Sequence, residues 1–216
     1  MKRELLATPD IAGAAASIFL SERPRTVALA GGRTPRDVHV RLAVEEYDWA
    51  ATHVFFGDER CVPPDHPDSN FRMANEALLS KVEAQVHRMR GETCDAAGYE
   101  EELRTVFTTG LPAFDLVFLG LGADGHTASL FPGDPALEET RRLVARVERP
   151  DHPRLTLTLP VLSAAKLAVF LVAGAEKREA LRRLLAGEDL TAGRVTARRV
   201  VIIADAAAAG AGSARL

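Results

Sequence analysis

The sequence predicts an α/β fold with an open, mainly parallel sheet and helices on both of its faces. Five apolar runs are too short for helices, and each ends in glycine or in a charged cluster. They are TVALAGG (26–32), HVFFGDER (53–60), FDLVFLGLG (114–122), AVFLVAG (168–174) and RVVIIAD (199–205). Helix-like amphipathic segments lie between them, at residues 35–46, 70–82, 97–109 and 175–187. This alternation is typical of buried parallel strands joined by helical crossovers.

The length and composition of the chain limit its class. With 216 residues, of which 47% are apolar and 26% charged, it can build one sizeable core, or a core with a small appended lobe. We expect a single domain over residues 1–216. The net charge of −3 supplies no basic field for a polyanion, so we expect no nucleic-acid partner. The oligomeric state is left open.

The amino-terminal stretch MKRELLATPDIAGAAASIFLSER has a basic tip and a short apolar run that acidic residues and Pro9 interrupt. We therefore interpret it as a helix that Thr8 caps and Pro9 begins, and not as a signal peptide. No run approaches the roughly 20 apolar residues that span a bilayer, so we expect no membrane partner. Cys61 and Cys94 form no C-x-x-C pair and have no metal-finger spacing, which favours a reducing compartment. We expect a cytoplasmic protein.

A paired-glycine turn follows the first apolar run. Gly31 and Gly32 would let a ligand approach the backbone closely, and Thr34 would cap a helix whose first residue is Pro35. The free amides of a helix start attract an anion, and Arg33 adds positive charge, so the turn is a candidate phosphate site. A tight strand-to-helix turn that binds no ligand favours the same residue types.

Three consecutive charges, Asp58, Glu59 and Arg60, stand at the end of the second apolar run. Strand alternation sends Asp58 and Arg60 to one face and Glu59 to the other. One interpretation is a solvated strand end with a local ion pair. The other is a ligand site, because the long loop CVPPDHPDSN (61–70) follows, and loops at the carboxyl ends of parallel strands form the ligand crevice.

Two further segments carry predictions. Lys177 falls in the first turn of the helix at 175–187, where the helix dipole disfavours a cation unless a bound phosphate reverses the penalty. A lysine that extends into water is the simpler alternative. The segment RLTLTLP (154–160) alternates leucine with polar residues, which predicts a strand with one solvated face at or near a sheet edge.

The stretch GLGADGH (120–126) has the G-x-G-x-x-G spacing of a dinucleotide-binding turn. Asp124 would place a negative charge beside a pyrophosphate, and the bulky His126 follows the third glycine, where close helix packing is needed. A catalytic loop fits better. At a helix start the dipole disfavours the imidazolium, so the His126 ring should stay neutral near pH 7, as a general base must. Asp124 would orient the ring or cap the helix.

Other chemistries find less support in the sequence. It has no G-x-S-x-G elbow, so a serine hydrolase would lack its nucleophile, and we expect Ser129 to cap or pack. The chain also has no H-x-x-x-H or similar pair. We therefore expect no metal at the oxygen-rich group formed by Asp58, Glu59, Asp124 and His126.

Together these stretches resemble the 6-phosphogluconolactonases of the sugar-phosphate isomerase and deaminase superfamily. The resemblance spans nearly the whole chain and rests on AGGRTP (30–35), GDERCVPPDHPDSNFRMANEALL (57–79), FDLVFLGLGADGHTASLFPG (114–133), RLTLTLPVL (154–162) and FLVAGAEKREALRRLL (170–185). Its most specific parts are D-E-R-x-V-P followed by S-N, and D-G-H-x-A-S-L-F-P-G. Glucosamine-6-phosphate deaminases are similar but have D-E-Y where this chain has D-E-R. In the family, serines usually flank the glycine pair, whereas here Ala30 precedes it and Arg33 follows.

The resemblance implies a Rossmann-like sheet of the sugar-phosphate isomerase type and hydrolysis of 6-phospho-D-glucono-1,5-lactone in the pentose phosphate pathway, without metal or nucleotide cofactor. Our hypothesis is that His126 takes a proton from the attacking water while Asp124 orients the ring. Arg60 and backbone amides of the glycine loop would stabilise the oxyanion. The residues expected to bind the substrate are Gly31, Gly32, Arg33, Thr34, Asp58, Arg60, Gly122, Arg154 and Lys177.

The sequence leaves several alternatives open. It does not decide which of Arg33, Arg60, Arg154 and Lys177 faces the phosphate and which faces the carbonyl. The alternative functions are an aminosugar-phosphate deaminase or isomerase, a sugar-phosphate-sensing domain and a nucleotide-binding protein.

Overall fold

The computed structural model describes residues 3–210 and contains a seven-stranded sheet in the order β1-β10-β9-β6-β2-β3-β5. Every neighbouring pair in this sheet is parallel, which confirms the predicted fold class. Its strands are β1 (Arg3–Ala7), β2 (Thr26–Leu29), β3 (His53–Phe56), β5 (Gln85–Val86), β6 (Leu116–Gly120), β9 (Leu167–Val172) and β10 (Arg199–Ala204).

A second, antiparallel sheet has three strands in the order β4-β8-β7. It corresponds to the small appended lobe that the length of the chain allowed. Its strands are β4 (Asp58–Arg60), β8 (Arg154–Leu157) and β7 (Val144–Val147). The α-helices are α1 (Ile11–Glu22), α2 (Arg33–Leu42), α3 (Asn70–Ala77), α4 (Ala96–Val106), α5 (Leu159–Ser163), α6 (Arg178–Ala186) and α7 (Ala206–Ala209). Short 3₁₀ turns lie at Leu79–Lys81, Pro135–Glu138, Ala175–Lys177 and Thr191–Arg194.

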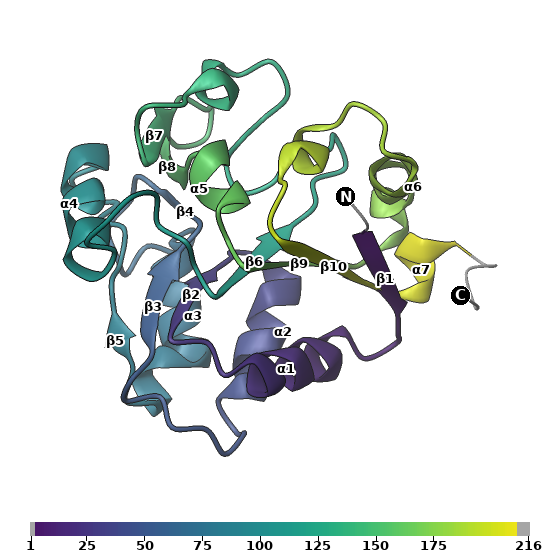
Figure 1. Cartoon of the computed structure of the whole chain (residues 1–216), viewed down its shortest axis with the longest axis horizontal. Coiled ribbons are helices and arrows are strands. Elements are labelled where there is room, and N and C mark those ends of the chain that lie inside the picture. The colour runs from purple at the N-terminus through teal and green to yellow at the C-terminus, as the bar shows by residue number, and fades with distance from the viewer. Residues whose placement is uncertain (1–2, 211–216) are drawn as a thin grey trace.

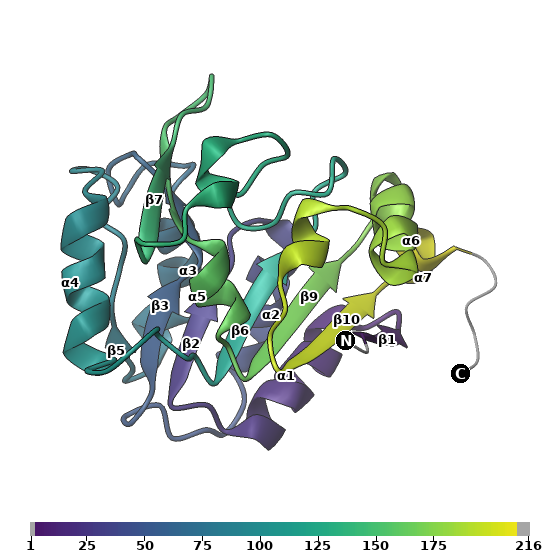
Figure 2. The same cartoon turned by 45° about the horizontal axis from the view of Figure 1, so that its top comes forward.

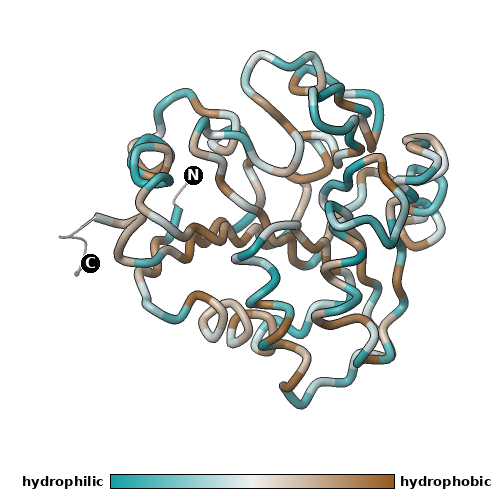
Figure 3. The backbone as a smooth tube through the Cα atoms, turned by 180° about the vertical axis from the view of Figure 1, so that it is seen from behind, coloured by the Kyte–Doolittle hydropathy of each residue, from teal (hydrophilic) through white to brown (hydrophobic). Residues whose placement is uncertain are grey.

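Helices cover both faces of the large sheet. In Figures 1 and 2, α1 and α2 lie together on one face, and α4, α5 and the small sheet lie on the other. The strands form an apolar band through the middle of the molecule in Figure 3, since β6, β9 and β10 carry almost only buried residues. No helix within residues 3–210 is long and apolar enough to cross a membrane.

The amino-terminal helix begins later than predicted. Asp10, and not Thr8, is its cap, because the Asp10 carboxylate accepts a hydrogen bond of 2.8 Å from the Gly13 amide. The helix therefore starts at Ile11, after Pro9. The residues before it form β1, a parallel edge strand paired with β10 that the sequence patterns did not indicate.

The second helix begins earlier than predicted. Gly32, whose φ of +103° suits glycine, is the N-cap of α2, so the helix starts at Arg33. Thr34 and Pro35 therefore lie within the first turn, and Thr34 is not the cap. Proline is tolerated there because the first amides of a helix have no partner within it.

The leucine-rich strand β8 is not a solvated edge strand, which corrects the sequence prediction. It is the central strand of the small sheet, between β4 and β7. Leu155 and Leu157 are buried as expected, but Thr156 between them is also fully buried. Its hydroxyl accepts a 3.3 Å hydrogen bond from the Ser129 amide, so the polar face is covered by the loop after β6.

Cys61 and Cys94 form a disulfide across 33 positions of sequence, with their Cα atoms 5.1 Å apart. It ties the residue after β4 to the segment before α4. Disulfides persist mainly in oxidising compartments, so this disulfide does not support the predicted reducing compartment. The cytoplasmic location, which partly depended on that argument, stays a prediction.

Candidate active site

The cleft lies at the carboxyl edge of the large sheet, where β2 and β6 are neighbours. From β2 the chain crosses to β3 on one side, and it later returns through β6 to the other side. Such a switch point opens a crevice between two strand ends, which is where open α/β sheets bind ligands. A hollow of about 160 Å³ here is lined by Ala30, Gly31, Gly32, Asp58, Arg60, Asn70, Gly120, Leu121, Gly122, His126, Ala128, Arg154 and Lys177.

His126 and Asp124 form a hydrogen-bonded couple beside this hollow. One oxygen of Asp124, Oδ1, lies 2.6 Å from the His126 Nδ1 and also accepts from the His126 amide at 3.1 Å. The His126 ring packs against Phe131 with 4.5 Å between ring centroids. The orientation that was predicted for Asp124 is therefore present in the structure.

The helix that was expected to begin at His126 is not present. Residues 121–134 form turns and an isolated bridge between Thr127 and Leu130, and regular structure resumes only at the 3₁₀ turn that follows. The helix-dipole argument for a neutral His126 is therefore wrong. Asp124 and Phe131 hold the ring instead, through a hydrogen bond and an apolar contact.

Asp124 carries the charge of the couple. Burial by itself would raise the pKa of Asp124, but hydrogen bonds from the amide and ring of His126, together with the charge of that ring, hold the pKa below its usual value. The carboxylate therefore stays ionised at neutral pH. An ionised carboxylate on Nδ1 favours the histidine tautomer whose proton is on Nδ1 and whose Nε2 carries a free lone pair.

The side chains of His126 and Asp124 occupy the space beside Gly122. A Cβ atom on Gly122 would overlap the Nδ1 of His126 and lie only 2.5 Å from the Oδ1 of Asp124. The Gly122 amide is also engaged, since it donates to the His126 carbonyl oxygen at 2.8 Å. The Gly125 amide in turn donates to Gly122 at 2.9 Å. These two amides close the loop and are not directed at a substrate.

The predicted alternation at β4 is confirmed. Asp58 and Arg60 line the cleft, whereas Glu59 points the other way and is only 2% exposed. Burial raises the pKa of Glu59, against the opposing effect of hydrogen bonds from the amides of Phe71, Asn70 and Arg60 and from the Ser69 hydroxyl. Glu59 thus joins β4 to the start of α3, and the solvated-strand interpretation is wrong for this residue.

Asn70 lines the cleft and the buried Ser129 contacts Asp58, and neither was predicted as a site residue. The Asn70 amide nitrogen donates to the Asp58 carbonyl oxygen at 2.9 Å, and its amide oxygen accepts from the Arg60 guanidinium. Ser129 donates its hydroxyl to the Asp58 carboxylate at 2.6 Å. A Cβ on Gly31 would overlap the Asn70 amide, which explains that glycine through packing. The S-N pair after the acidic loop was the available signal for Asn70.

The cations that the sequence singled out meet here in part. Arg60 and Arg154 are paired directly across β4 and β8. Lys177 lines the cleft from the end of β9; it ends a 3₁₀ turn and is the N-cap of α6, and does not lie in the first turn of the helix as predicted. Arg33 is exposed and, with Thr34, lines only a wider hollow of about 650 Å³. That hollow shares Gly31, Gly32, Gly120, Leu121 and Lys177 with the cleft, so the two hollows lie side by side.

The chain was compared with known proteins. Residues 6–203 match the family described as glucosamine-6-phosphate isomerases/6-phosphogluconolactonase. It is 49% identical over 173 residues to a 6-phosphogluconolactonase of Synechocystis sp., which covers 76% of this chain and 72% of the relative. It is 43% identical over 171 residues to a 6-phosphogluconolactonase of Nostoc sp., which covers 74% of this chain and 71% of the relative.

Solved structures agree with the sequence comparisons. The crystal structure of 6-phosphogluconolactonase from Thermotoga maritima superposes with a TM-score of 0.85 at 31% identity, over 94% of this chain and 100% of that chain. A monomeric glucosamine-6-phosphate deaminase has a TM-score of 0.80 at 21% identity, covers 97% of this chain and 99% of that chain, and shares the fold. The chain belongs to the family of glucosamine-6-phosphate isomerases and 6-phosphogluconolactonases.

Proposed function

We propose that the chain hydrolyses 6-phospho-D-glucono-1,5-lactone to 6-phospho-D-gluconate in the oxidative pentose phosphate pathway. The names of its 6-phosphogluconolactonase relatives support this activity. One structural observation carries the mechanism: the His126–Asp124 couple opens on the same cleft as Arg60, Arg154 and Lys177. A general base and a set of cations are what hydrolysis of a phosphorylated lactone needs.

In the proposed reaction, Nε2 of His126 takes a proton from a water molecule as its oxygen attacks the lactone carbonyl carbon. The carbonyl oxygen becomes an oxyanion, and Asp124 stabilises the imidazolium that forms. When the intermediate collapses, the bond from that carbon to the ring oxygen breaks, and the leaving oxygen receives the proton from His126. The product is the open-chain carboxylic acid, which ionises, and no step calls for a metal or a nucleotide cofactor.

We assign the cations by their place along the cleft. Lys177, Gly31 and Gly32 line both hollows, so a substrate that spans them has one end at the start of α2 and the other at His126. The phosphate would lie with Lys177 and with Arg33, Thr34 and the free amides of the α2 amino terminus. Arg60, which Asn70 and the Asp68 carbonyl hold in place, would stabilise the oxyanion beside His126.

The test is a lactonase assay on freshly prepared lactone, with the spontaneous hydrolysis subtracted. We expect turnover of the phosphorylated lactone and much slower turnover of unphosphorylated glucono-1,5-lactone, since Lys177 would then lack its partner. Equal rates on both lactones would contradict the phosphate assignment. Ammonia release from glucosamine 6-phosphate, with no lactone turnover, would instead assign the deaminase reaction.

Two statements about the setting of the protein stay predictions. Residues 3–210 contain no helix that could cross a membrane, and the chain has a net charge of −3. We infer a cytoplasmic protein whose partner is the phosphosugar lactone and not a nucleic acid. Cell fractionation with an antibody against the chain tests the location, and recovery in the membrane pellet would contradict it.

A further inference from the structure

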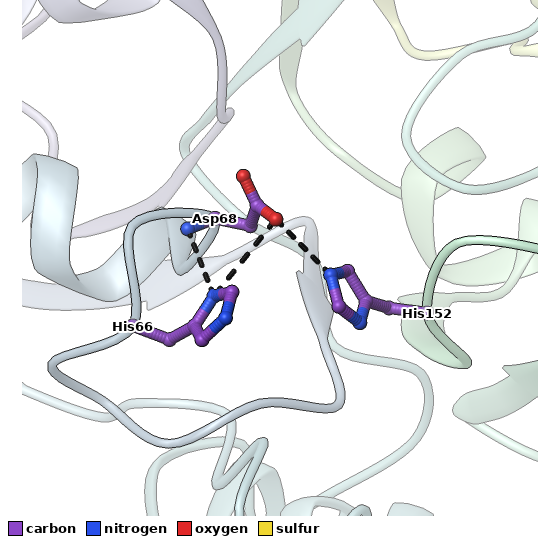
Figure 4. Close-up of side chains that lie close together, drawn as sticks. All are labelled: His66, Asp68 and His152. Carbon is purple, nitrogen blue, oxygen red and sulfur yellow. Dashed lines mark hydrogen bonds and ion pairs between the residues drawn. The ribbon is translucent and has the colours of Figure 1, made fainter.

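Three potential metal ligands meet outside the catalytic couple (Figure 4). His66 and Asp68 lie in the loop before α3, and His152 lies in the connection between β7 and β8. One ligand atom from each residue lies within 4.8 Å of the other two. We propose that these three side chains bind a divalent transition-metal ion of the zinc class, with water in the fourth position.

The distances suit such an ion. The Asp68 Oδ2 lies 3.0 Å from the His152 Nε2 and 3.9 Å from the His66 Nδ1. A tetrahedral zinc with bonds of about 2.0–2.2 Å places its ligand atoms about 3.4 Å apart. The two observed distances bracket that value and the third pair of ligand atoms lies within 4.8 Å, so small side-chain movements would close the site. Two imidazoles and one carboxylate are also ligand types that zinc accepts with one position left to water.

The backbone holds the two contributing segments together before any ion binds. The Cys61 amide donates to the Pro153 carbonyl oxygen at 2.8 Å, which joins the acidic loop to the β7–β8 connection. Within the loop, the Ser69 amide donates to the His66 carbonyl oxygen at 3.0 Å. The ligands are therefore brought together by the fold, which lowers the entropy cost of metal binding.

The hydrogen bonds within the cluster of His66, Asp68 and His152 indicate which ring nitrogens carry a proton. The Asp68 amide donates to the His66 Nδ1 at 3.1 Å, so this nitrogen is unprotonated and carries the lone pair that an ion needs, and an ion bound there would replace the amide hydrogen bond. The His152 Nε2 shares a proton with the Asp68 carboxylate at 3.0 Å, and the ion would replace that proton. The side chains of His66, Asp68 and His152 are 37%, 56% and 30% exposed, so an ion and its water can reach them.

The structure contains a second group of two histidines and a carboxylate, His53, His87 and Glu102, which differs from the proposed metal site in its hydrogen bonds. His87 uses one ring nitrogen on the His53 Nδ1 at 2.9 Å and the other on the Glu102 Oε1 at 2.5 Å. Both ring nitrogens of His87 are therefore engaged in one hydrogen-bonded chain, whereas the hydrogen bonds of the proposed site use one ring nitrogen each of His66 and His152. His53 is therefore a matched control histidine for the proposed site.

The proposed ion would connect two walls of the cleft. Asp68 accepts a 3.2 Å hydrogen bond from the Arg60 guanidinium through its carbonyl oxygen, and His152 lies two residues before Arg154. An ion on these side chains would thus fix the segments that carry the paired arginines. Neither His126 nor Asp124 takes part, so the metal site does not depend on the proposed lactone hydrolysis.

The test uses Co²⁺, a visible stand-in for Zn²⁺, titrated into the full chain after treatment with a chelator. We expect one equivalent to bind, with the strong visible absorption of a four-coordinate site, and Zn²⁺ to displace it. Loss of an outer partner of a metal ligand costs about 10–100-fold in affinity, so His66→Asn, Asp68→Asn and His152→Asn should each cost at least about tenfold. His53→Asn and His126→Asn should bind Co²⁺ like the parent chain.

A thermal readout checks the same site without a chromophore. Zn²⁺ at one hundred times its dissociation constant should raise the melting temperature of the parent chain by about 5–10 °C, and that of His152→Asn by much less. Absence of one-equivalent binding at 100 μM Co²⁺, with no zinc-dependent rise in melting temperature, would overturn the proposal. Binding that survives in His152→Asn but is lost in His126→Asn would move the ion to the lactone cleft and would also overturn it.

Discussion

Arg60 and Arg154 face each other directly across the antiparallel strands β4 and β8, and both line the cleft beside His126. Like charges opposite each other weaken a sheet by about 0.2–1 kcal/mol. Arg154 has Asp151 as its carboxylate partner at 2.6 Å, whereas Arg60 donates to uncharged oxygens of Asp68 and Asn70. The Nε of Arg154 is buried and has no hydrogen-bond partner within residues 3–210. The pair is short of negative charge, which an anionic substrate would supply.

Replacing Arg154 by glutamine should therefore separate stability from activity. We expect kcat/KM on the phosphorylated lactone to fall about 10- to 100-fold, the value of a hydrogen bond to a charged group. The free energy of unfolding should change by less than about 1 kcal/mol, because relief of repulsion offsets the lost contact with Asp151. Urea unfolding and initial rates on the same preparation measure both. A large loss of stability with unchanged kcat/KM would make Arg154 a structural residue only.

Replacing His126 by alanine should lower kcat by roughly 10²–10⁴-fold, since that is the usual contribution of a general base. Asp124→Asn should lower kcat with little change in KM, because asparagine can no longer stabilise the imidazolium. Both are measured on fresh lactone with the background subtracted. Near-normal turnover in His126→Ala would remove this residue from the mechanism.

Gly122→Ala should inactivate the enzyme without unfolding it. The new methyl group would occupy the space of the His126 Nδ1 and displace the couple, and misplacement by about 1 Å can cost about 10²-fold in rate. Gly193→Ala is the control, since a Cβ there meets its nearest atoms at 3.6 Å, an ordinary contact. Circular dichroism checks the fold of both variants. Full activity in Gly122→Ala would show that the cleft tolerates another position of His126.

Lys177→Ala should raise KM for the phosphorylated lactone by at least about tenfold, because a charge-assisted hydrogen bond contributes about 1.5–3 kcal/mol. Its rate on unphosphorylated glucono-1,5-lactone should not change. Lys166→Ala is the matched control, as this lysine pairs with Asp115 at 2.7 Å away from the cleft. A loss confined to kcat would place Lys177 at the reacting carbonyl instead.

His39 makes the fold sensitive to acid. It is fully buried on α2, neither ring nitrogen has a hydrogen-bond partner within residues 3–210, and burial lowers its pKa to about 4. The unfolded chain has the ordinary pKa near 6.5, so it binds the proton first as the pH falls. The titration of His39 therefore costs no stability above about pH 6.5. As the pH falls from there toward 4, it lowers the free energy of unfolding by about 3 kcal/mol at most.

The variant His39→Leu isolates this effect, because it fills the site with an apolar side chain that does not titrate. We expect the difference in unfolding free energy between His39→Leu and the parent chain to grow in favour of the variant between pH 7.5 and pH 4.5. Urea titrations at several pH values measure it. A difference that does not vary with pH would show that His39 is not the titrating group.

The alternating pattern of apolar runs and helices predicted five of the seven strands of the large sheet, β2, β3, β6, β9 and β10, because a buried parallel strand is a nearly continuous apolar run. It did not reveal the edge strands β1 and β5, because short strands with exposed positions have no continuous apolar run. It also misplaced β8, whose polar Thr156 is covered by the loop that carries Ser129. Such coverage depends on distant parts of the chain.

The sequence by itself determined the composition of the site. Glycines that follow strands, the charged triplet at residues 58–60 and the pair Asp124 and His126 all lie at strand ends, and parallel strands bring their carboxyl ends to one edge. Only the tertiary structure decided how these residues are held. The structure places Glu59 under α3. The pairing of Arg60 with Arg154 and the cluster of His66, Asp68 and His152 join segments far apart in sequence. Their contacts follow from the order in which crossovers place the strands, and no local pattern records that order.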